Sequence, residues 1–344
     1  MLSAALKLAG ADVLECRTDD GSIVAQYRRV WNQLRLADFD VLVLTYPAHR
    51  FIPLAWAASR RWNVPILLDP LFSLFDTKVG DRHEVHPLGL RSLVMRAADW
   101  AGCRMSAFVL TDSNAHADFL SDRSGIPRDR FIRIWTGTDE RIMRPCDSPP
   151  VSSPLHPGDG ILHVVHYGNY FPLQGTDVIV RAAEILSRIG SPTIVTMIGD
   201  GPTRAKARMH AQVAALENVR FVARVSYTTL RDYLCSADVV LGVFGTTGKA
   251  RRVVPNKVFD ALAVGRCLIT GDTPAAREFL EQGVDALLCP VGEAEALADC
   301  IERVRIDEDL RRHLSERGAV RFVEAASVVA QSESLAPLLR SLAR

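Results

Sequence analysis

Basic side chains gather in one glycine-containing stretch of the sequence, between a short apolar run and a helical pattern. The stretch is GVFGTTGKARRVVPNKVFDALAVG, residues 242–265, and its basic residues are Lys249, Arg251, Arg252 and Lys257. Asn256 precedes the last of these, and Asp260 follows it within the first turns of the expected helix. Such a group of cations can bind a diphosphate through charge-assisted hydrogen bonds. A charged loop that only faces solvent is the alternative interpretation.

A second candidate for anion binding is VVHYGNYFPLQGTDVIV, residues 164–180, which predicts a strand, a loop and the start of a helix. Gly168 and Asn169 begin the loop, and Gln174 lies just before its second glycine. Glycine allows backbone N–H groups to approach an anion, and a helix N-terminus adds a partial positive charge. The stretch contains no lysine or arginine. We therefore expect the positive charge to come from residues 242–265, and from Lys257 in particular.

A third loop has the sequence IGDGP, residues 198–202, in which Gly199 and Gly201 flank Asp200. Pro202 suits the first position of a helix. The third glycine of a dinucleotide fingerprint is missing, so the pattern does not indicate that kind of site. We expect this loop to bind the same ligand as the other two.

The elements that position these loops are short apolar runs that alternate with helical patterns. In the first half, strands are expected at residues 40–47, 65–69, 107–111 and 131–135, and helices at 51–62 and around 116–121. In the second half, strands are expected near 162–167, 193–198, 219–222, 239–243, 267–270 and 286–289. Continuous apolar strands are typical of a parallel sheet that is covered on both faces. Ligands of such sheets bind at the carboxyl ends of the strands, where the three loops lie.

The domain division follows from CDSPPVSSPLHPGDG, residues 146–160, which is rich in proline and has no periodicity. We expect an N-terminal domain at 1–147, a linker at 148–160, a C-terminal domain at 161–325 and a final helical segment at 326–344. Both domains are predicted to be α/β and doubly wound. The chain opens with MLSAALKLAGADVLEC, a helix followed by a strand, so the N-terminal domain lacks the expected first strand. Either the true start lies upstream or the sheet is built without it.

Composition excludes some classes of protein. Lys and Arg number 41 against 40 Asp and Glu, a net charge of +1, which argues against nucleic acid as the main partner. The seven cysteines are scattered and never spaced C-x-x-C, so we expect buried thiols rather than disulfides or a zinc site. No signal peptide and no apolar run of about 20 residues is present, so we expect a cytoplasmic protein.

Several stretches of the second half together resemble glycosyltransferases of the GT-B fold, in the group 1 (family 4-like) class. They are HYGNYFPLQGTDVIVRAAEIL, MIGDGP, VRFVARVSYTTLRDYLCSADVVLGVFG, VPNKVFDALAVGRCLITGDTPAAREFLEQGVDALLCPVGEAEALADCI and LRRHLSERGAVRF. WTGTDERIMRP, residues 135–145, is similar to the stretch that ends the family's N-terminal domain.

The resemblance implies two Rossmann-like domains facing a cleft. The C-terminal domain would bind a nucleotide-diphosphate sugar, and the N-terminal domain a sugar or lipid-linked acceptor. The final helix would return to the N-terminal domain. Transfer would retain anomeric configuration, would need neither metal nor cofactor, and would serve polysaccharide, glycolipid or other cell-envelope assembly. The Asp-x-Asp sequences at 38–40 and 307–309 are not expected to bind metal.

This chain departs from the family at four positions. Many members have an arginine after the first glycine and a lysine before the second, both in contact with the diphosphate; here these positions are Asn169 and Gln174. The same members place two glutamates across the third loop and helix, where this chain has Arg252 and Asp260. Asp260 retains a carboxylate that can accept hydrogen bonds from hydroxyl groups.

Arg224 follows the strand VRFVA, where the family often packs the nucleobase.

The N-terminal half gives weaker signals. His49 follows a strand and is a candidate contact to the acceptor. LGLRSLVMRAADWAGCRM, residues 88–105, predicts a helix packed in the N-terminal domain, with peripheral contact to an anionic membrane as the alternative.

A second function is a catalytically weak or inactive family member that acts as a binding or partner subunit. A third is a nucleotide-sugar epimerase on the same fold. Donor hydrolysis without acceptor would separate an enzyme from a binding subunit, and an epimerised product would identify the third.

Overall fold

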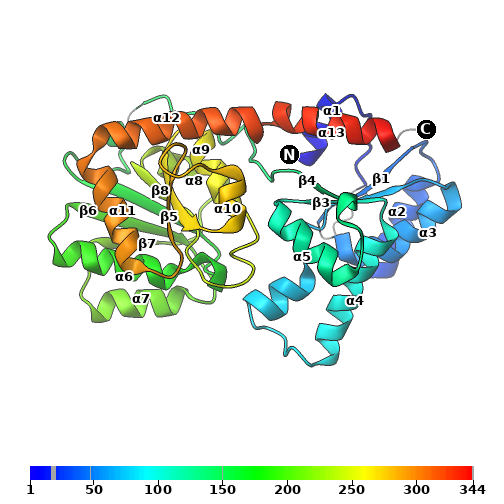
Figure 1. Ribbon diagram of the computed structural model, residues 1–344, viewed down its shortest axis with the longest axis horizontal. Helices are drawn as coiled ribbons and strands as arrows, with labels where there is room; N and C mark the ends of the chain where they lie inside the picture. The colour runs from blue at the N-terminus through cyan, green and yellow to red at the C-terminus, as the bar shows by residue number, and fades with distance from the viewer. Residues whose placement is uncertain (17–20, 47, 149, 343–344) are drawn as a thin grey trace. The chain divides into compact units, whose positions relative to one another are not determined.

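The computed structural model describes residues 1–16, 21–46, 48–148 and 150–342, and the chain divides into two compact units (Figure 1). The first unit comprises Met1–Trp135 and Val328–Arg344, and the second comprises Thr136–Ser327. The proline-rich residues 148–160 therefore fall inside the second unit. Pro47 and Pro149, which belong to an expected strand and to the expected linker, lie outside the described residues.

The first unit contains a four-stranded parallel sheet in chain order, β1-β2-β3-β4. Its strands are β1 (Leu42–Leu44), β2 (Ile66–Leu68), β3 (Phe108–Thr111) and β4 (Phe131–Arg133). The helices between them are α3 (Ile52–Trp62), α4 (Leu90–Met105) and α5 (Asn114–Ser124). Right-handed crossovers between neighbouring strands in one direction place these helices on one face of the sheet. The apolar strands predicted from the sequence are all present, shorter by one to five residues.

Two helices from opposite ends of the chain cover the other face (Figure 1). They are α1 (Leu2–Leu8) and α13 (Val328–Leu342). Leu6 of α1 and Leu335 of α13 pack in one cluster with Leu67 and Leu110 of the sheet. The strand residues adjacent to these two, Leu68 and Val109, lie in a separate cluster on the opposite face. This alternation of side chains follows from the period of two in a β-strand.

The strand that we expected after the first helix is absent. Residues 11–16 form no strand, although Val13 packs against the α1–α13 cluster. α2 (Ile23–Leu34) follows and is capped by Ser22, whose hydroxyl accepts from the Ala25 N–H at 3.3 Å. The short helical turns are η1 (Ala48–Phe51), η2 (Asp76–Asp81), η3 (Arg128–Arg130), η4 (Pro150–Ser152) and η5 (Pro172–Gln174).

The second unit contains a six-stranded parallel sheet with the order β10-β9-β8-β5-β6-β7. Its strands are β5 (Leu162–Gly168), β6 (Thr193–Gly199), β7 (Val219–Val222), β8 (Val239–Leu241), β9 (Cys267–Asp272) and β10 (Leu287–Pro290). The strand order reverses between β5 and β8, which pair through Val164 with Val239 and Val165 with Val240. This reversal is the topological switch point at which doubly wound sheets bind ligands. All six strands were predicted within a few residues of their ends.

Helices cover both faces of this sheet. α6 (Thr176–Arg188), α7 (Arg204–Val213) and α11 (Ala294–Ile306) share one apolar cluster with the strands. α9 (Asn256–Ala263) and α12 (Glu308–Ala325) pack together on the sheet, while α8 (Tyr227–Cys235) and α10 (Pro274–Phe279) complete the crossovers. Among the described residues, none of these or the other helices is long and apolar enough to cross a membrane.

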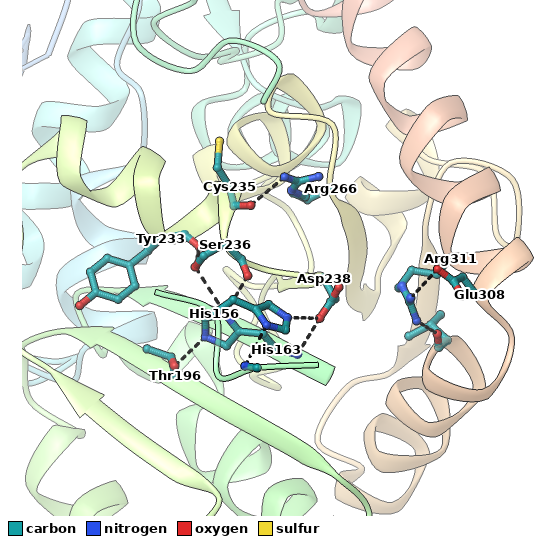
Figure 2. Close-up of polar contacts among 12 residues, drawn as sticks. His156, His163, Thr196, Tyr233, Cys235, Ser236, Asp238, Arg266, Glu308 and Arg311 are labelled. Atoms are coloured by element: carbon teal, nitrogen blue, oxygen red, sulfur yellow. Dashed lines mark hydrogen bonds and ion pairs between the residues drawn. The ribbon is translucent and has the colours of Figure 1, made fainter. Parts of the chain in front are cut away.

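A polar cluster lies at the amino ends of β5 and β8, at the opposite end of the sheet from the glycine loops (Figure 2). His163 is buried between the Ser236 carbonyl and the Thr196 hydroxyl, each 2.9 Å from a ring nitrogen. Its backbone N–H donates to Asp238, which also lies 3.0 Å from His156. Burial lowers the pKa of His163. We interpret this cluster as structural, because every group in it is bonded to the chain.

One expectation about cysteine is wrong. Cys146 and Cys235 form a disulfide, with their Cα atoms 5.6 Å apart across 89 residues of sequence. The Arg266 guanidinium donates to the Cys235 carbonyl at 2.7 Å (Figure 2). It also donates to the Ser148 carbonyl at 3.1 Å, so the segment after Cys146 is held by this bond as well as by the disulfide. Folding brings the two cysteines together, and their spacing in the sequence carries no sign of it. The other five cysteines are free, as expected.

Breaking this disulfide should destabilise the second unit. We expect Cys235→Ser, or reduction of the native protein, to lower the free energy of unfolding by about 2–4 kcal/mol, because the crosslink restricts a long loop in the unfolded chain. Urea unfolding with and without dithiothreitol measures the difference in free energy of unfolding between the reduced and the disulfide-bonded protein. In Cys235→Ser, which has no disulfide to reduce, dithiothreitol should not change the free energy of unfolding. Titration of all seven thiols in the unfolded, unreduced protein would contradict the disulfide.

Candidate functional site

The candidate site is formed where three glycine loops meet at the carboxyl ends of β5, β6 and β8. Gly168 and Gly199 end neighbouring strands with positive φ values of 155° and 119°. A Cβ atom on Gly199 would lie 2.0 Å from the Gly168 carbonyl oxygen, and one on Gly201 would lie 1.7 Å from that of Asn169. Any larger residue would therefore push the first two loops apart.

The third loop packs against the first in the same way. A Cβ atom on Gly175, at φ 63°, would lie 2.5 Å from the carbonyl carbon of Phe244. One on Gly245 would lie 2.4 Å from the Pro172 carbonyl oxygen. The predicted glycines therefore bring the three loops into backbone contact at the switch point, which is what an anion cradle made of backbone groups requires.

The two neutral residues of the first loop have partners inside the site. The side-chain oxygen of Asn169 accepts from the Arg224 guanidinium at 2.9 Å, so an arginine from the loop after β7 reaches the first loop. The buried Gln174 accepts from the Tyr170 N–H at 3.1 Å and stabilises the loop on which it lies.

A lysine and an aspartate are buried on α9, close to the end of β5. The Lys257 ammonium nitrogen lies 3.5 Å from Nε2 of His166 and 5.4 Å from the centre of the Tyr167 ring. Burial lowers the pKa of Lys257 to about 7, and Asp260 opposes that shift. Burial, together with the lysine charge, holds the pKa of His166 well below its usual range, so the imidazole is neutral.

Three hydroxyl groups donate to the Asp260 carboxylate. Tyr227 donates to Oδ1 at 2.8 Å, Thr138 donates to the same oxygen, and Tyr167 donates to Oδ2. Burial raises the pKa of Asp260, while these donors lower it. The carboxylate therefore joins β5, α8, α9 and the segment before Asp139. Its place in this network leaves it to hold the three hydroxyl groups together rather than to face solvent.

The other predicted residues of the second unit lie around this centre. Asn256 begins α9, Lys249 is buried, and the Arg252 guanidinium lies beside Gly248. Asp200 is exposed and accepts from the Gly201 N–H at 2.8 Å. The cationic loop and the glycine loops thus follow strands β5, β6 and β8, which are neighbours or near neighbours in one sheet.

His49, the predicted acceptor contact, belongs to the first unit. Its Nε2 lies 3.0 Å from Oδ1 of Asp99, and both side chains are mostly buried. Asp99 also accepts from the N–H groups of Leu74 and Phe75, at 2.9 and 3.0 Å. A role of His49 toward an acceptor stays a prediction, and the geometry gives it a structural role in holding the segment around Leu74.

The residues that sequence reasoning missed are the partners of Asp260. They are Thr138, Tyr167 and Tyr227, which come from three separate parts of the chain. Each lies within a stretch quoted for the family resemblance, but nothing in its own neighbourhood singles it out. Tyr167 had the best signal, because it directly precedes the first glycine of the loop. Among the described residues, no group of three or more His, Cys, Asp and Glu side chains could hold a metal ion.

Sequence comparison finds glycosyltransferases. A family model described as glycosyl transferases group 1 matches residues 161–307. Alpha-D-kanosaminyltransferase of Streptomyces kanamyceticus is 21% identical over 253 residues, which cover 71% of this chain and 64% of that protein. The lipopolysaccharide core biosynthesis glycosyltransferase LpsE of Rhizobium meliloti (strain 1021) is 23% identical over 65% of this chain and 62% of its own. The chain spans less than two thirds of the length of these relatives.

Structure comparison finds the same fold. Anabaena Alr3699/HepE, solved with UDP and glucose, matches 96% of this chain and 86% of its own, with a TM-score of 0.71 and 17% identity. Sucrose-phosphate synthase of Thermosynechococcus elongatus matches over 93% of this chain and 78% of its own, with a TM-score of 0.72 and 17% identity. The expected α/β class, with two Rossmann-like domains of GT-B type, is confirmed. The resemblance to group 1 glycosyltransferases is confirmed over residues 161–307.

Proposed function

We propose that this protein, whose residues 161–307 match the family model of group 1 glycosyl transferases, moves a sugar from a nucleotide-diphosphate donor to an acceptor hydroxyl. The observation that carries the proposal is the buried Lys257 ammonium beside the end of β5, at the switch point where the three glycine loops meet. A buried cation there is suited to a ligand that brings negative charge. A diphosphate leaving group does so, and its charge increases as the glycosidic bond breaks.

The chain supplies positive charge in a way that differs from the pattern of its family. The first loop has Asn169 where many members have an arginine, and that asparagine holds Arg224 at 2.9 Å. In our proposal, Arg224 reaches the diphosphate from the loop after β7 and Lys257 reaches it from α9, and backbone N–H groups of the first loop complete the site. Lys249 and Arg252 would supply further charge from the third loop.

The finer parts of the proposal concern the reaction and its setting. We propose retention of anomeric configuration, without a metal or cofactor, and a sugar or lipid-linked acceptor bound by the first unit. The names of the relatives support glycan assembly, since LpsE acts in lipopolysaccharide core biosynthesis. HepE was solved with UDP and glucose, which supports a nucleotide sugar as donor.

The second candidate is a binding or partner subunit that has lost activity. It is favoured by Gln174 and Asp260, which stand where many members have a lysine and a glutamate and which here bond to the chain itself. A third candidate, a nucleotide-sugar epimerase, has no observation of its own in its favour.

Thermal unfolding against UDP, GDP, ADP, dTDP and their sugars tests the proposal. A ligand at about 100 times its dissociation constant should stabilise the protein by about 2.7 kcal/mol. One nucleotide series that raises the melting temperature identifies the donor, and release of free sugar from it then separates transferase from binding subunit. If no nucleotide raises the melting temperature of the folded protein, the proposal is wrong and the partner-subunit function leads. Epimerised donor would instead identify the epimerase.

A further inference from the structure

Large apolar side chains are exposed at the start of α4 and in the residue pair before it. Leu88 is 90% exposed, Leu90 78%, Leu93 62% and Val94 60%. In Figure 1 this end of α4 lies at the outer limit of the first unit, away from its sheet. Trp100, further along the same helix, is also exposed. A group of neighbouring apolar residues exposed to this extent indicates an interaction surface, whereas single scattered apolar residues on a surface do not.

The exposed side of α4 is not needed to hold the helix in the unit. Gly102 and Cys103, near the end of the helix, are buried on its inner face, and Cys103 packs in one cluster with Leu68 and Val109 of the sheet. A Cβ atom on Gly102 would lie only 2.9 Å from Cδ1 of Ile52 on α3. The helix is therefore packed in the N-terminal domain, as the sequence favoured, and still presents a second apolar face.

The charges on this surface have one sign. Arg91, Arg96 and Arg104 are exposed along α4, and Arg96 lies 4.3 Å from the centre of the Phe75 ring. Asp99 is the acidic residue between Leu88 and Met105, and its carboxylate is turned inward to the Leu74 and Phe75 N–H groups. The exposed side of residues 88–104 thus combines apolar side chains with arginines and has no exposed carboxylate.

We propose that the exposed side of residues 88–104, the α4 surface, binds the anionic face of a lipid bilayer. Leucines 88, 90 and 93 enter the boundary between headgroups and acyl chains, and the arginines bind lipid phosphates around them. Trp100 suits the same boundary, because an indole ring has an apolar body and a polar N–H group. The α4 surface would then hold the enzyme at a membrane independently of any sugar donor.

A second copy of the chain fits this surface less well. A two-fold interface brings the same patch of both subunits together, so the arginines of each copy would meet a patch that has no exposed carboxylate to pair with them. Anionic lipid supplies the missing negative charge, and a bilayer accepts apolar side chains without a matching pocket. Charge complementarity therefore favours the membrane.

Cosedimentation with vesicles of phosphatidylcholine alone, or with added phosphatidylglycerol, tests the proposal without nucleotide. We expect binding to the anionic vesicles, weakened by salt. The double variant Leu90→Ser/Leu93→Ser should reduce partitioning by about tenfold or more, since two leucines no longer leave water. Leu36→Ser is the matched control, because Leu36 is 91% exposed in the same unit but outside the α4 surface, and it should bind like the native protein.

A second variant tests the charges. Arg91→Gln/Arg96→Gln should weaken binding to anionic vesicles and reduce its dependence on salt. The proposal is wrong if the native protein binds neither kind of vesicle. It is also wrong if the Leu90→Ser/Leu93→Ser variant melts like the native protein and binds the anionic vesicles equally well. Dimerisation in sedimentation velocity that the leucine variant abolishes would assign the α4 surface to a second copy instead. Because no donor is present, failure here leaves the transferase proposal intact.

Discussion

Replacing Lys257 by methionine is expected to lower turnover of the nucleotide-sugar donor by about 100- to 1,000-fold, which is the typical effect of removing one preorganised group that stabilises transition-state charge. Methionine keeps the length and apolar stem of lysine but has no charge. The lysine lies in a buried position, 3.5 Å from a neutral His166, where its interaction with a diphosphate is screened little by water. Steady-state donor hydrolysis and transfer measure the effect.

The same substitution should not destabilise the protein. The pKa of Lys257 falls to about 7 in the folded chain, from about 10.4 in the unfolded chain. Between these values the unfolded chain binds more protons, so the free energy of unfolding rises with pH. The free-energy cost of burying the charged lysine is fully present below pH 7 and disappears above about pH 10.4. Lys257→Met removes a penalty of at most about 5 kcal/mol, so its melting temperature should equal or exceed the native one at neutral pH.

The pH dependence of turnover gives a further test. The charged form of Lys257 is the form that binds a diphosphate, and in the free enzyme it predominates below pH 7. We expect kcat/KM for the donor to fall as pH rises through about 7, and to lose that limb in Lys257→Met. Lys206→Met, on the exposed side of α7, is the control and should change neither rate nor profile. Native turnover by Lys257→Met would show that the charge comes from another residue.

The fold was largely predictable because its strands are continuous apolar runs bounded by glycine and proline. All six strands of the second unit were found within a few residues, since burial on both faces leaves a run such as Val239–Leu241 without polar interruptions. Residues 11–16 were mistaken for a strand because Val13 and Leu14 are apolar, yet no neighbouring strand pairs with them. Pairing depends on the rest of the fold, which a local pattern does not contain.

The candidate site was predictable in part, for a related reason. The glycines of the three loops were found because the loops are in backbone contact, and a Cβ atom on Gly201 would lie only 1.7 Å from a backbone oxygen of the next loop. No other residue type fits such a position, so the sequence itself marks it. The partners of Asp260 were missed because they meet only in the fold. The disulfide between Cys146 and Cys235 was missed for the same reason, across 89 residues.

Replacing Asp260 by alanine is expected to lower the free energy of unfolding by about 3–5 kcal/mol, as removal of one partner of a buried charged group does. Lys257 would keep its buried position without a counter-charge, and the Thr138, Tyr167 and Tyr227 hydroxyls would lose their acceptor. Asp260→Asn should be milder, because the amide keeps one carbonyl oxygen. Urea unfolding measures both. Asp272→Ala is the control: Asp272 pairs with an exposed Arg277, so its loss should change stability by about 1 kcal/mol or less.

A double-variant cycle separates the two contributions to that loss. If Asp260 acts mainly as the counter-charge of Lys257, Lys257→Met should recover much of the stability lost in Asp260→Ala, because no buried charge remains. If it acts mainly as the acceptor for three hydroxyls, Lys257→Met should recover little. In both cases Asp260→Ala alone must be strongly destabilising, because both roles depend on the buried carboxylate. A loss no larger than that of Asp272→Ala would show that neither role holds, and that the site around Lys257 is positioned by packing alone.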